Sequence, residues 1–146
     1  MKKFKFALEN ILKYRQSIED QEKELLARAM QKVQMEESLA QKLELEKHTH
    51  LSSYDVISSN IVKMRQQESY MASLELRIKN QQKQLDKAKS ASDNIRVKVV
   101  KATTNRKILE SLKEQHLTGY RQELDRAEQK ILDEVGISAY NRKENR

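Results

Sequence analysis

The sequence of 146 residues contains no proline and only two glycines, Gly119 and Gly136. Compact folds use about 12% glycine and proline to turn the chain, so this chain can turn at few places. Two phenylalanines, five tyrosines and no tryptophan supply few large side chains for a globular core. With 37% hydrophobic and 35% charged residues, the composition favours long helices that share a narrow apolar stripe.

The absence of cysteine excludes disulfides and thiolate metal sites, and it favours the cytoplasm. Near the basic start, Glu9, Asn10 and Lys13 interrupt the apolar residues before the core of a signal peptide can form. No run approaches the roughly 20 apolar residues of a membrane span. The net charge of +7 indicates an acidic partner, and it leaves nucleic acid, anionic lipid and an acidic protein surface open.

Apolar residues three and four apart predict a first helix over residues 4–50. Its expected stripe consists of Phe4, Leu8, Ile11, Ile18, Leu25, Ala29, Val33, Leu39 and Leu43. Because Arg15, Glu22, Lys32 and Glu36 fall on or beside this stripe, a strict heptad zipper is not expected.

The pattern breaks between residues 48 and 55, where hydroxyl and acidic side chains compete for backbone hydrogen bonds. We therefore predict a turn over residues 51–56, with residues 58–60 as a second candidate.

A more regular pattern predicts a second helix over residues 57–135. It ends at Gly136, since a left-handed residue costs glycine little, and a flexible tail follows over residues 136–146. The expected stripe is Ile57, Ile61, Met64, Met71, Leu74, Ile78, Leu85, Ala88, Ile95, Val99, Ala102, Leu109, Leu112, Tyr120, Leu124, Ala127, Ile131 and Val135. The predicted fold is all-α: one elongated domain over residues 1–146, an antiparallel two-helix coiled coil with the second helix longer than the first.

At about 1.5 Å per residue the two helices would be roughly 70 and 120 Å long, so the second must extend past the first. A turn near residue 53 would place Phe4 opposite Ala102 and leave the residues after about 105 without a partner in the chain. Apolar side chains exposed in a row usually mark a contact surface. The first expected contact surface is therefore Leu109, Leu112, Leu117, Tyr120, Leu124 and Ile131.

Charge is distributed unevenly along the chain. Residues 17–46 carry eight acidic and four basic side chains, whereas residues 77–107 carry ten basic and two acidic ones. Antiparallel pairing lays these stretches partly side by side, which favours that alignment modestly. In the same alignment the basic start of the chain would lie beside the basic residues 96–107, and an acidic cavity of a partner would complete that end.

Residues for catalysis or metal binding are sparse. His48 and His50 point to different faces of a helix and His116 is distant in sequence, so no metal site is expected. A helix pair encloses no pocket and the chain has no glycine-rich phosphate loop, so neither an enzyme nor a cofactor is expected.

The basic residues could also bind nucleic acid or a membrane surface. The basic stretch lacks aromatics and alternates with the stripe, so a solvated basic face is favoured over nucleic-acid binding. An interfacial membrane helix over residues 2–16 stays open, ranked below packing against a protein partner. Leu74 belongs to the stripe of the second helix, and Tyr70, four residues earlier, flanks it with an outward hydroxyl.

The two ends of the chain carry a more specific pattern. The start reads Phe4-x-Phe6-x-Leu8-Glu9-x-x-Leu12-x-Tyr14-Arg15, and then Glu24-x-Leu26-Ala27-x-Ala29. The far end reads Arg106-Lys107-x-Leu109-Glu110-x-Leu112-Lys113-Glu114, then Tyr120, Glu123, Glu128-Gln129-Lys130 and Asp133-Glu134. In order and spacing these residues resemble the FliJ family of flagellar export proteins over nearly the whole chain.

The resemblance implies an antiparallel coiled coil similar to the central stalk subunit of rotary ATPases. It implies a cytoplasmic component of the flagellar type III export apparatus, peripheral to the inner face of the membrane at the flagellar base. Such a stalk stands in the ring of the export ATPase hexamer, promotes ring assembly and activity, and links the ring to the cytoplasmic domain of the export gate. Family members also handle export chaperones.

The resemblance also implies roles for particular residues. The family's gate contact is an aromatic and a leucine four apart, and Tyr70 with Leu74 occupies the matching place, whereas the family's tyrosines late in the first helix are replaced by Glu46 and His50. We hypothesise that the joined terminal end enters the ATPase ring, through Lys98, Lys101, Arg106, Lys107, Leu109, Leu112 and Tyr120. Alternatives are the equivalent stalk of a virulence secretion system, a passive structural coiled coil and a nucleic-acid binder.

Overall fold

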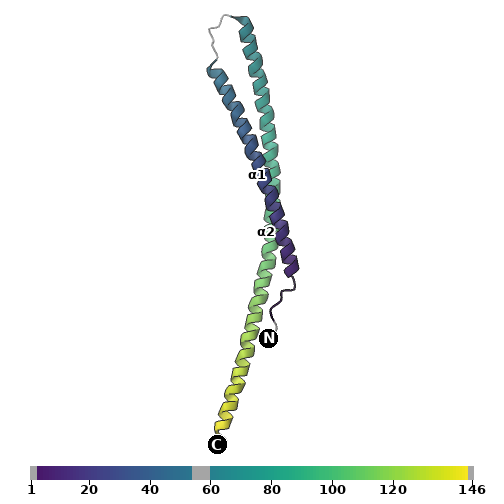
Figure 1. The fold of residues 1–146 in the computed structure, drawn as a ribbon, viewed down its shortest axis with the longest axis vertical. Coiled ribbons are helices and arrows are strands. Elements are labelled where there is room, and N and C mark those ends of the chain that lie inside the picture. The colour runs from purple at the N-terminus through teal and green to yellow at the C-terminus, as the bar shows by residue number, and fades with distance from the viewer. Residues whose placement is uncertain (1–2, 54–59, 145–146) are drawn as a thin grey trace. The chain divides into compact units, whose positions relative to one another are not determined.

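The computed structural model describes residues 3–53 and 60–144, with side chains up to residue 141. Over this part of the chain the fold is all-α, with helix α1 over Glu9–Ser52 and helix α2 over Ile61–Glu144. The two helices pack against each other as an antiparallel hairpin in which α2 is the longer (Figure 1). The predicted fold class is confirmed.

The start of α1 lies later than predicted. The helix begins at Glu9 rather than at residue 4, and the Glu9 amide donates to the Phe6 carbonyl at 3.2 Å. Glu9 supplies an acidic side chain in the first turn, which the helix dipole favours.

The connection between the helices falls partly in the predicted turn. α1 continues through Leu51 and Ser52, and residues 54–56 of the predicted turn lie outside the described residues. The Ser52 and Ser53 hydroxyls donate to the carbonyls of Thr49 and His50 at 2.9 and 3.0 Å, so they satisfy acceptors that the end of the helix leaves free.

The second candidate turn is also only partly described. Of its residues 58–60, only Asn60 lies within the described part of the chain. The Asn60 side-chain oxygen accepts from the Val62 amide at 3.0 Å, which caps the start of α2.

The predicted end of the second helix is wrong. α2 runs through Gly136 and ends at Glu144, so the segment expected to be a flexible tail is helical up to that residue. Neither glycine adopts a positive φ angle. Glycine permits a left-handed residue but does not impose one, and here it is accommodated inside the helix.

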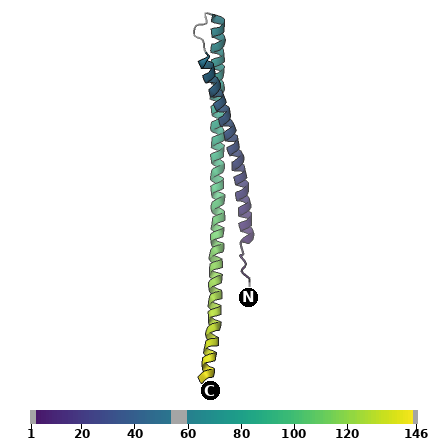
Figure 2. The same cartoon turned by 60° about the vertical axis from the view of Figure 1, so that its left-hand side comes forward.

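The chain divides into two compact units that are described separately. One unit, called here the hairpin unit, consists of residues 19–101, and the other, called the terminal unit, consists of residues 1–18 and 102–146. Each unit contains parts of both helices running in opposite directions, as Figures 1 and 2 show for the hairpin unit.

Within the hairpin unit, most of the less exposed residues of both helices follow alternating steps of four and three; Glu37 and Glu46, which are also half-buried, lie beside them. In α1 these are Glu19, Glu22, Leu26, Ala29, Val33, Glu36, Ala40, Leu43, Lys47 and His50. In α2 they are Gln67, Met71, Leu74, Ile78, Gln81, Leu85, Ala88, Ser92, Ile95 and Val99. This spacing is the heptad repeat of a coiled coil. Glu22 and Glu36 occupy positions of the repeat, so it is not a strict apolar zipper.

The heptad spacing is regular, but both apolar and polar side chains occupy its positions. In α1 it selects Leu26 where the pattern had suggested Leu25, and Leu25 and Leu39 are both 47% exposed. Polar side chains occupy repeat positions, and Gln81 donates from α2 to the Glu36 carboxylate at 2.5 Å and to its backbone carbonyl at 3.1 Å. The sequence pattern was irregular because polar residues stand where a zipper usually has leucine.

Ion pairs flank the heptad positions of the hairpin unit. Lys89 lies 3.0 Å from Glu37, Lys47 lies 3.4 Å from Glu75, and Arg77 lies 3.8 Å from Glu46. The Lys89–Glu37 and Arg77–Glu46 pairs place the acidic stretch of α1 beside the basic stretch of α2, as the charge distribution predicts, whereas Lys47–Glu75 has the reverse polarity and lies outside both stretches. The register differs from the predicted one because His50, at the end of α1, contacts Tyr70 rather than the first residues of α2.

Candidate partner-binding surfaces

A non-helical segment packs against α2 in the terminal unit. The ring of Phe4 lies 5.6 Å from that of Tyr120, and the ring of Phe6 lies 5.8 Å from His116 with its plane nearly perpendicular. One turn further, Lys113 forms an ion pair with Glu9 at 2.7 Å. Phe6 is buried, so this segment contributes to the packing of the unit.

These contacts correct the predicted register. Phe4 lies beside Tyr120 and not beside Ala102, and α2 has partners within the chain well beyond residue 105. The expectation that the basic start of the chain lies beside residues 96–107 is also wrong, because the described contacts of that segment fall on residues 113–120.

The uncovered part of α2 begins later than predicted. Of the first expected surface, Leu109, Leu117 and Leu124 are half-buried, Leu112 is 36% exposed, and Tyr120 packs on Phe4. Beyond Leu124, every large apolar side chain up to residue 141 is at least 61% exposed. We call this set the C-terminal apolar stretch: Ile131, Leu132, Val135, Ile137 and Tyr140.

The residues expected at the ATPase ring differ in accessibility. Lys98 and Lys101 are exposed and belong to the hairpin unit, whereas the others belong to the terminal unit. There Lys107 is exposed, while Arg106 is half-buried and forms an ion pair with Glu110. Among the basic residues expected at the ring, the three lysines are therefore more accessible to solvent than Arg106.

The expected gate residues occupy the hairpin unit. Leu74 is 0% exposed and belongs to the heptad positions, as the periodicity predicts. Tyr70 is 38% exposed, its ring lies 4.6 Å from that of His50, and its hydroxyl donates to the Glu46 carboxylate. The structure therefore presents Tyr70 to solvent and covers Leu74.

The Glu46 carboxylate dominates the electrostatics of Tyr70. The hydrogen bond that the Tyr70 hydroxyl donates to it raises the pKa of Tyr70 above the ordinary value of 10.0. Desolvation and the negative charge of Glu46 also raise this pKa, while the positive charge of Arg77 lowers it.

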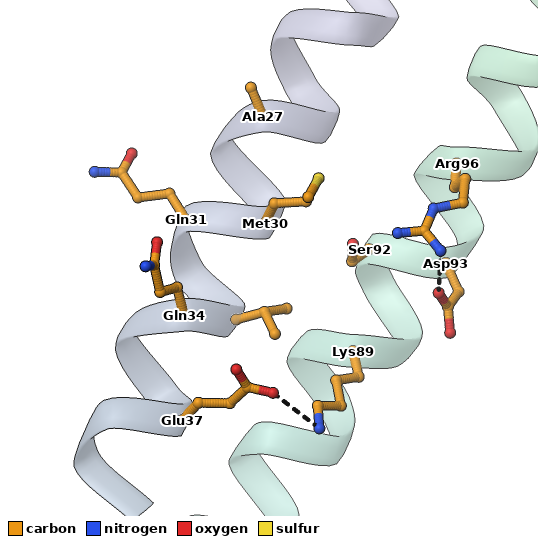
Figure 3. A pocket seen from close by; sticks show the side chains of 10 residues that line it. Ala27, Met30, Gln31, Gln34, Glu37, Lys89, Ser92, Asp93 and Arg96 are labelled. Carbon is orange, nitrogen blue, oxygen red and sulfur yellow. Dashed lines mark ion pairs between the residues drawn. The ribbon is translucent and has the colours of Figure 1, made fainter.

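Residues of both helices line a groove of about 710 Å³ in the hairpin unit (Figure 3). Ala27, Met30 and Val33 supply its apolar side chains, and the Lys89–Glu37 and Arg96–Asp93 ion pairs lie along it. Small residues at the neighbouring heptad positions Ala88 and Ser92 leave this space. Its charged groups are paired with one another, so the groove carries no evident catalytic chemistry.

Neither a metal centre nor a membrane segment is found in the described part of the chain. Residues 3–53 and 60–144 contain no group of three metal-ligating side chains. None of the helices they form is apolar enough over a sufficient length to cross a bilayer.

The contacts of Glu46 with Tyr70 and Arg77 could not be found from the sequence. Glu46 and His50 stand where the resemblance led us to expect tyrosines, and only the register of the helices reveals that both reach Tyr70. The available signal was the charge pattern, which predicts that acidic residues of α1 face basic residues of α2.

Paired helices and an uncovered apolar end define a helical coiled-coil protein. The model of the family described as "Flagellar FliJ protein" matches residues 4–145, so the chain belongs to the FliJ family. It is therefore a structural, non-enzymatic component of the flagellar export apparatus. No curated protein and no solved structure matches the chain.

Proposed function

We propose that the chain is the central stalk of the flagellar export ATPase: it enters the ring of the ATPase hexamer and promotes ring assembly and activity. In this role it resides in the cytoplasm, peripheral to the inner face of the membrane at the flagellar base. The C-terminal apolar stretch carries the proposal, because its side chains are exposed on a helix that continues from the packed part of α2. Exposed apolar rows of this kind mark protein contact surfaces.

The proposed ring surface combines this stretch with charge. The ring residues expected from the sequence, Lys98, Lys101, Arg106, Lys107, Leu109, Leu112 and Tyr120, are retained as the proposal. The exposed lysines among them suit an acidic lining of the ring, which would speed association and set its orientation. Tyr120 would act indirectly, since it holds Phe4.

The test is the hydrolysis rate of the cognate export ATPase titrated with this protein. Replacing both Ile131 and Val135 by glutamine should reduce stimulation about tenfold or more, the effect of losing central interface side chains. Replacing Leu76 by glutamine is the matched control, because Leu76 is 60% exposed but belongs to the hairpin unit. Stimulation that survives the double substitution would overturn the proposal, and a stable dimer in sedimentation would favour a passive structural coiled coil.

We further propose that Tyr70 and Leu74 bind the cytoplasmic domain of the export gate, and that the protein also helps to handle export chaperones. The exposed edge of Tyr70 supports the gate assignment, because half-exposed tyrosines are frequent anchors at interfaces. Replacing both residues by alanine should weaken gate binding and leave ATPase stimulation intact. Leu85→Ala removes another buried leucine of the same unit, 6% exposed, and separates loss of contact from loss of stability. Equal loss of both activities would overturn this division.

A further inference from the structure

Leu74 presents a difficulty for any partner that binds it. Its side chain has no exposed surface, so a partner can reach it only if α1 and α2 separate locally. The hairpin unit must therefore contain contacts that set the cost of this opening. That a partner needs to reach Leu74 at all rests on the proposed function of this residue.

The side of the hairpin unit beyond Leu74, toward the connection between the helices, is weakly packed. Residues 61–66 of α2 are exposed, and the first half-buried heptad positions of α2 are Gln67 and Met71. The Gln67 side-chain oxygen and the His50 Nε2 atom are buried without hydrogen-bond partners among the described residues. Unsatisfied buried polar atoms disfavour the closed state, so these layers resist opening little.

One carboxylate ties the two helices together on both sides of Leu74. Glu46 of α1 accepts the hydroxyl of Tyr70, which lies one turn before Leu74, and its Oε1 lies 3.8 Å from the guanidinium of Arg77, which lies almost one turn after it. The ring of His50 packs against that of Tyr70 at 4.6 Å. The two contacts of Glu46 therefore bridge α1 and α2 on either side of Leu74.

We infer that Glu46, Tyr70 and Arg77 form a latch that keeps α1 and α2 closed over Leu74, and that a partner reaches Leu74 only when this latch releases. Glu46 is its central member, because removing this one side chain breaks the contacts to both Tyr70 and Arg77. Glu46 and Arg77 are positioning residues in this mechanism: they control the exposure of Leu74 without being part of the proposed gate contact.

The chain suits a direct test because it contains no cysteine. A single Leu74→Cys substitution introduces one thiol at the protected position, and the rate of its reaction with a maleimide reports local opening. Adding Glu46→Ala or Tyr70→Phe should raise this rate about three- to tenfold, the range for loss of one hydrogen bond between helices. Adding Glu37→Ala, which breaks the Lys89 ion pair instead, should leave the rate unchanged.

A second thiol site tests whether the effect is local. Leu85→Cys places the thiol at another buried heptad position of the hairpin unit, and its reaction rate should not respond to Glu46→Ala. Equal acceleration at both sites would mean general destabilisation and would overturn the latch. Should Leu74→Cys prevent folding, amide hydrogen exchange over residues 71–78 of the cysteine-free chain measures the same opening, and an unchanged exchange rate in Glu46→Ala would overturn it too.

Binding of the gate domain to Glu46→Ala separates this inference from the proposed function. Faster labelling together with tighter gate binding supports both the latch and the gate contact of Leu74. Faster labelling with unchanged gate binding supports the latch and overturns the assignment of Leu74 to the gate. Unchanged labelling overturns the latch whatever the gate domain does.

Discussion

The hairpin unit and the terminal unit hold their helices together by different means. The hairpin unit uses a strict heptad repeat that includes Glu36 and Gln81, flanked by ion pairs between α1 and α2. The terminal unit adds aromatic contacts from a non-helical segment, through Phe4 and Phe6, and then leaves α2 uncovered. Polar heptad positions specify register at a cost in stability, whereas an aromatic segment adds buried area without a long helix partner.

The largest expected difference between the two units is in the stability cost of substituting a core side chain. Leu74→Ala should cost about 3 kcal/mol of unfolding free energy, because a fully buried leucine is removed from helices packed on each other. Phe6→Ala should cost about 1–2 kcal/mol, less than for a core phenylalanine, because a chain end can open separately. Urea unfolding followed by circular dichroism measures both.

The exposed residues beside these positions provide the controls. Leu76→Ala removes a leucine that is 60% exposed and should change stability by less than about 0.5 kcal/mol. If Phe6→Ala proved as costly as Leu74→Ala, the N-terminal segment would be as integral to the fold as the heptad core.

The next largest change in unfolding free energy is expected at the polar heptad positions Glu36 and Gln81 of the hairpin unit. Gln81→Leu alone should destabilise by about 1–2 kcal/mol, because the half-buried Glu36 carboxylate loses its hydrogen-bond donor. The double substitution Glu36→Leu and Gln81→Leu should recover this loss and exceed the stability of the native pair. Thermal unfolding of the two variants and the parent decides the matter, and a double variant less stable than the single one would show that the layer stabilises the fold outright.

The smallest expected effect concerns the hydroxyl of Tyr70. Its pKa is raised in the folded state, so folding favours the protonated phenol. The stabilisation is therefore complete below the unfolded pKa of about 10 and is lost as the pH rises through the higher folded value. The difference in unfolding free energy between the parent and Tyr70→Phe should be constant from pH 7 to 9 and decline in more alkaline solution. A difference that grew with pH would contradict the contact with Glu46.

The sequence was sufficient for the fold class and for most of the α2 stripe, because a period near 3.5 residues is visible in residues such as Leu74, Leu85 and Ala102. It was insufficient for α1, where charged residues hold heptad positions and Ile11, Leu25 and Leu39 are exposed. The predicted register was wrong because α2 begins at Ile61, well before Tyr70, the residue that contacts His50 at the end of α1. No local sequence signal reports that offset.

The candidate binding surfaces were also only partly predictable from the sequence. The exposed apolar end of α2 was expected, and only its beginning moved, from about residue 105 to beyond Leu124, because Phe4 and Phe6 cover residues 116–120. The contacts of Glu46 depend on side chains of two helices meeting across the register, which a single sequence does not encode in any short pattern.

The polar heptad positions of α1 have a consequence for biosynthesis. The ribosome completes α1 before most of α2, so a nascent chain displays α1 without its partner. Because Glu19, Glu22, Glu36 and Lys47 interrupt its stripe, two such nascent helices would bring like charges together rather than form a stable pair. This repulsion would disfavour pairing between neighbouring nascent chains before each α2 emerges and folds back onto its own α1.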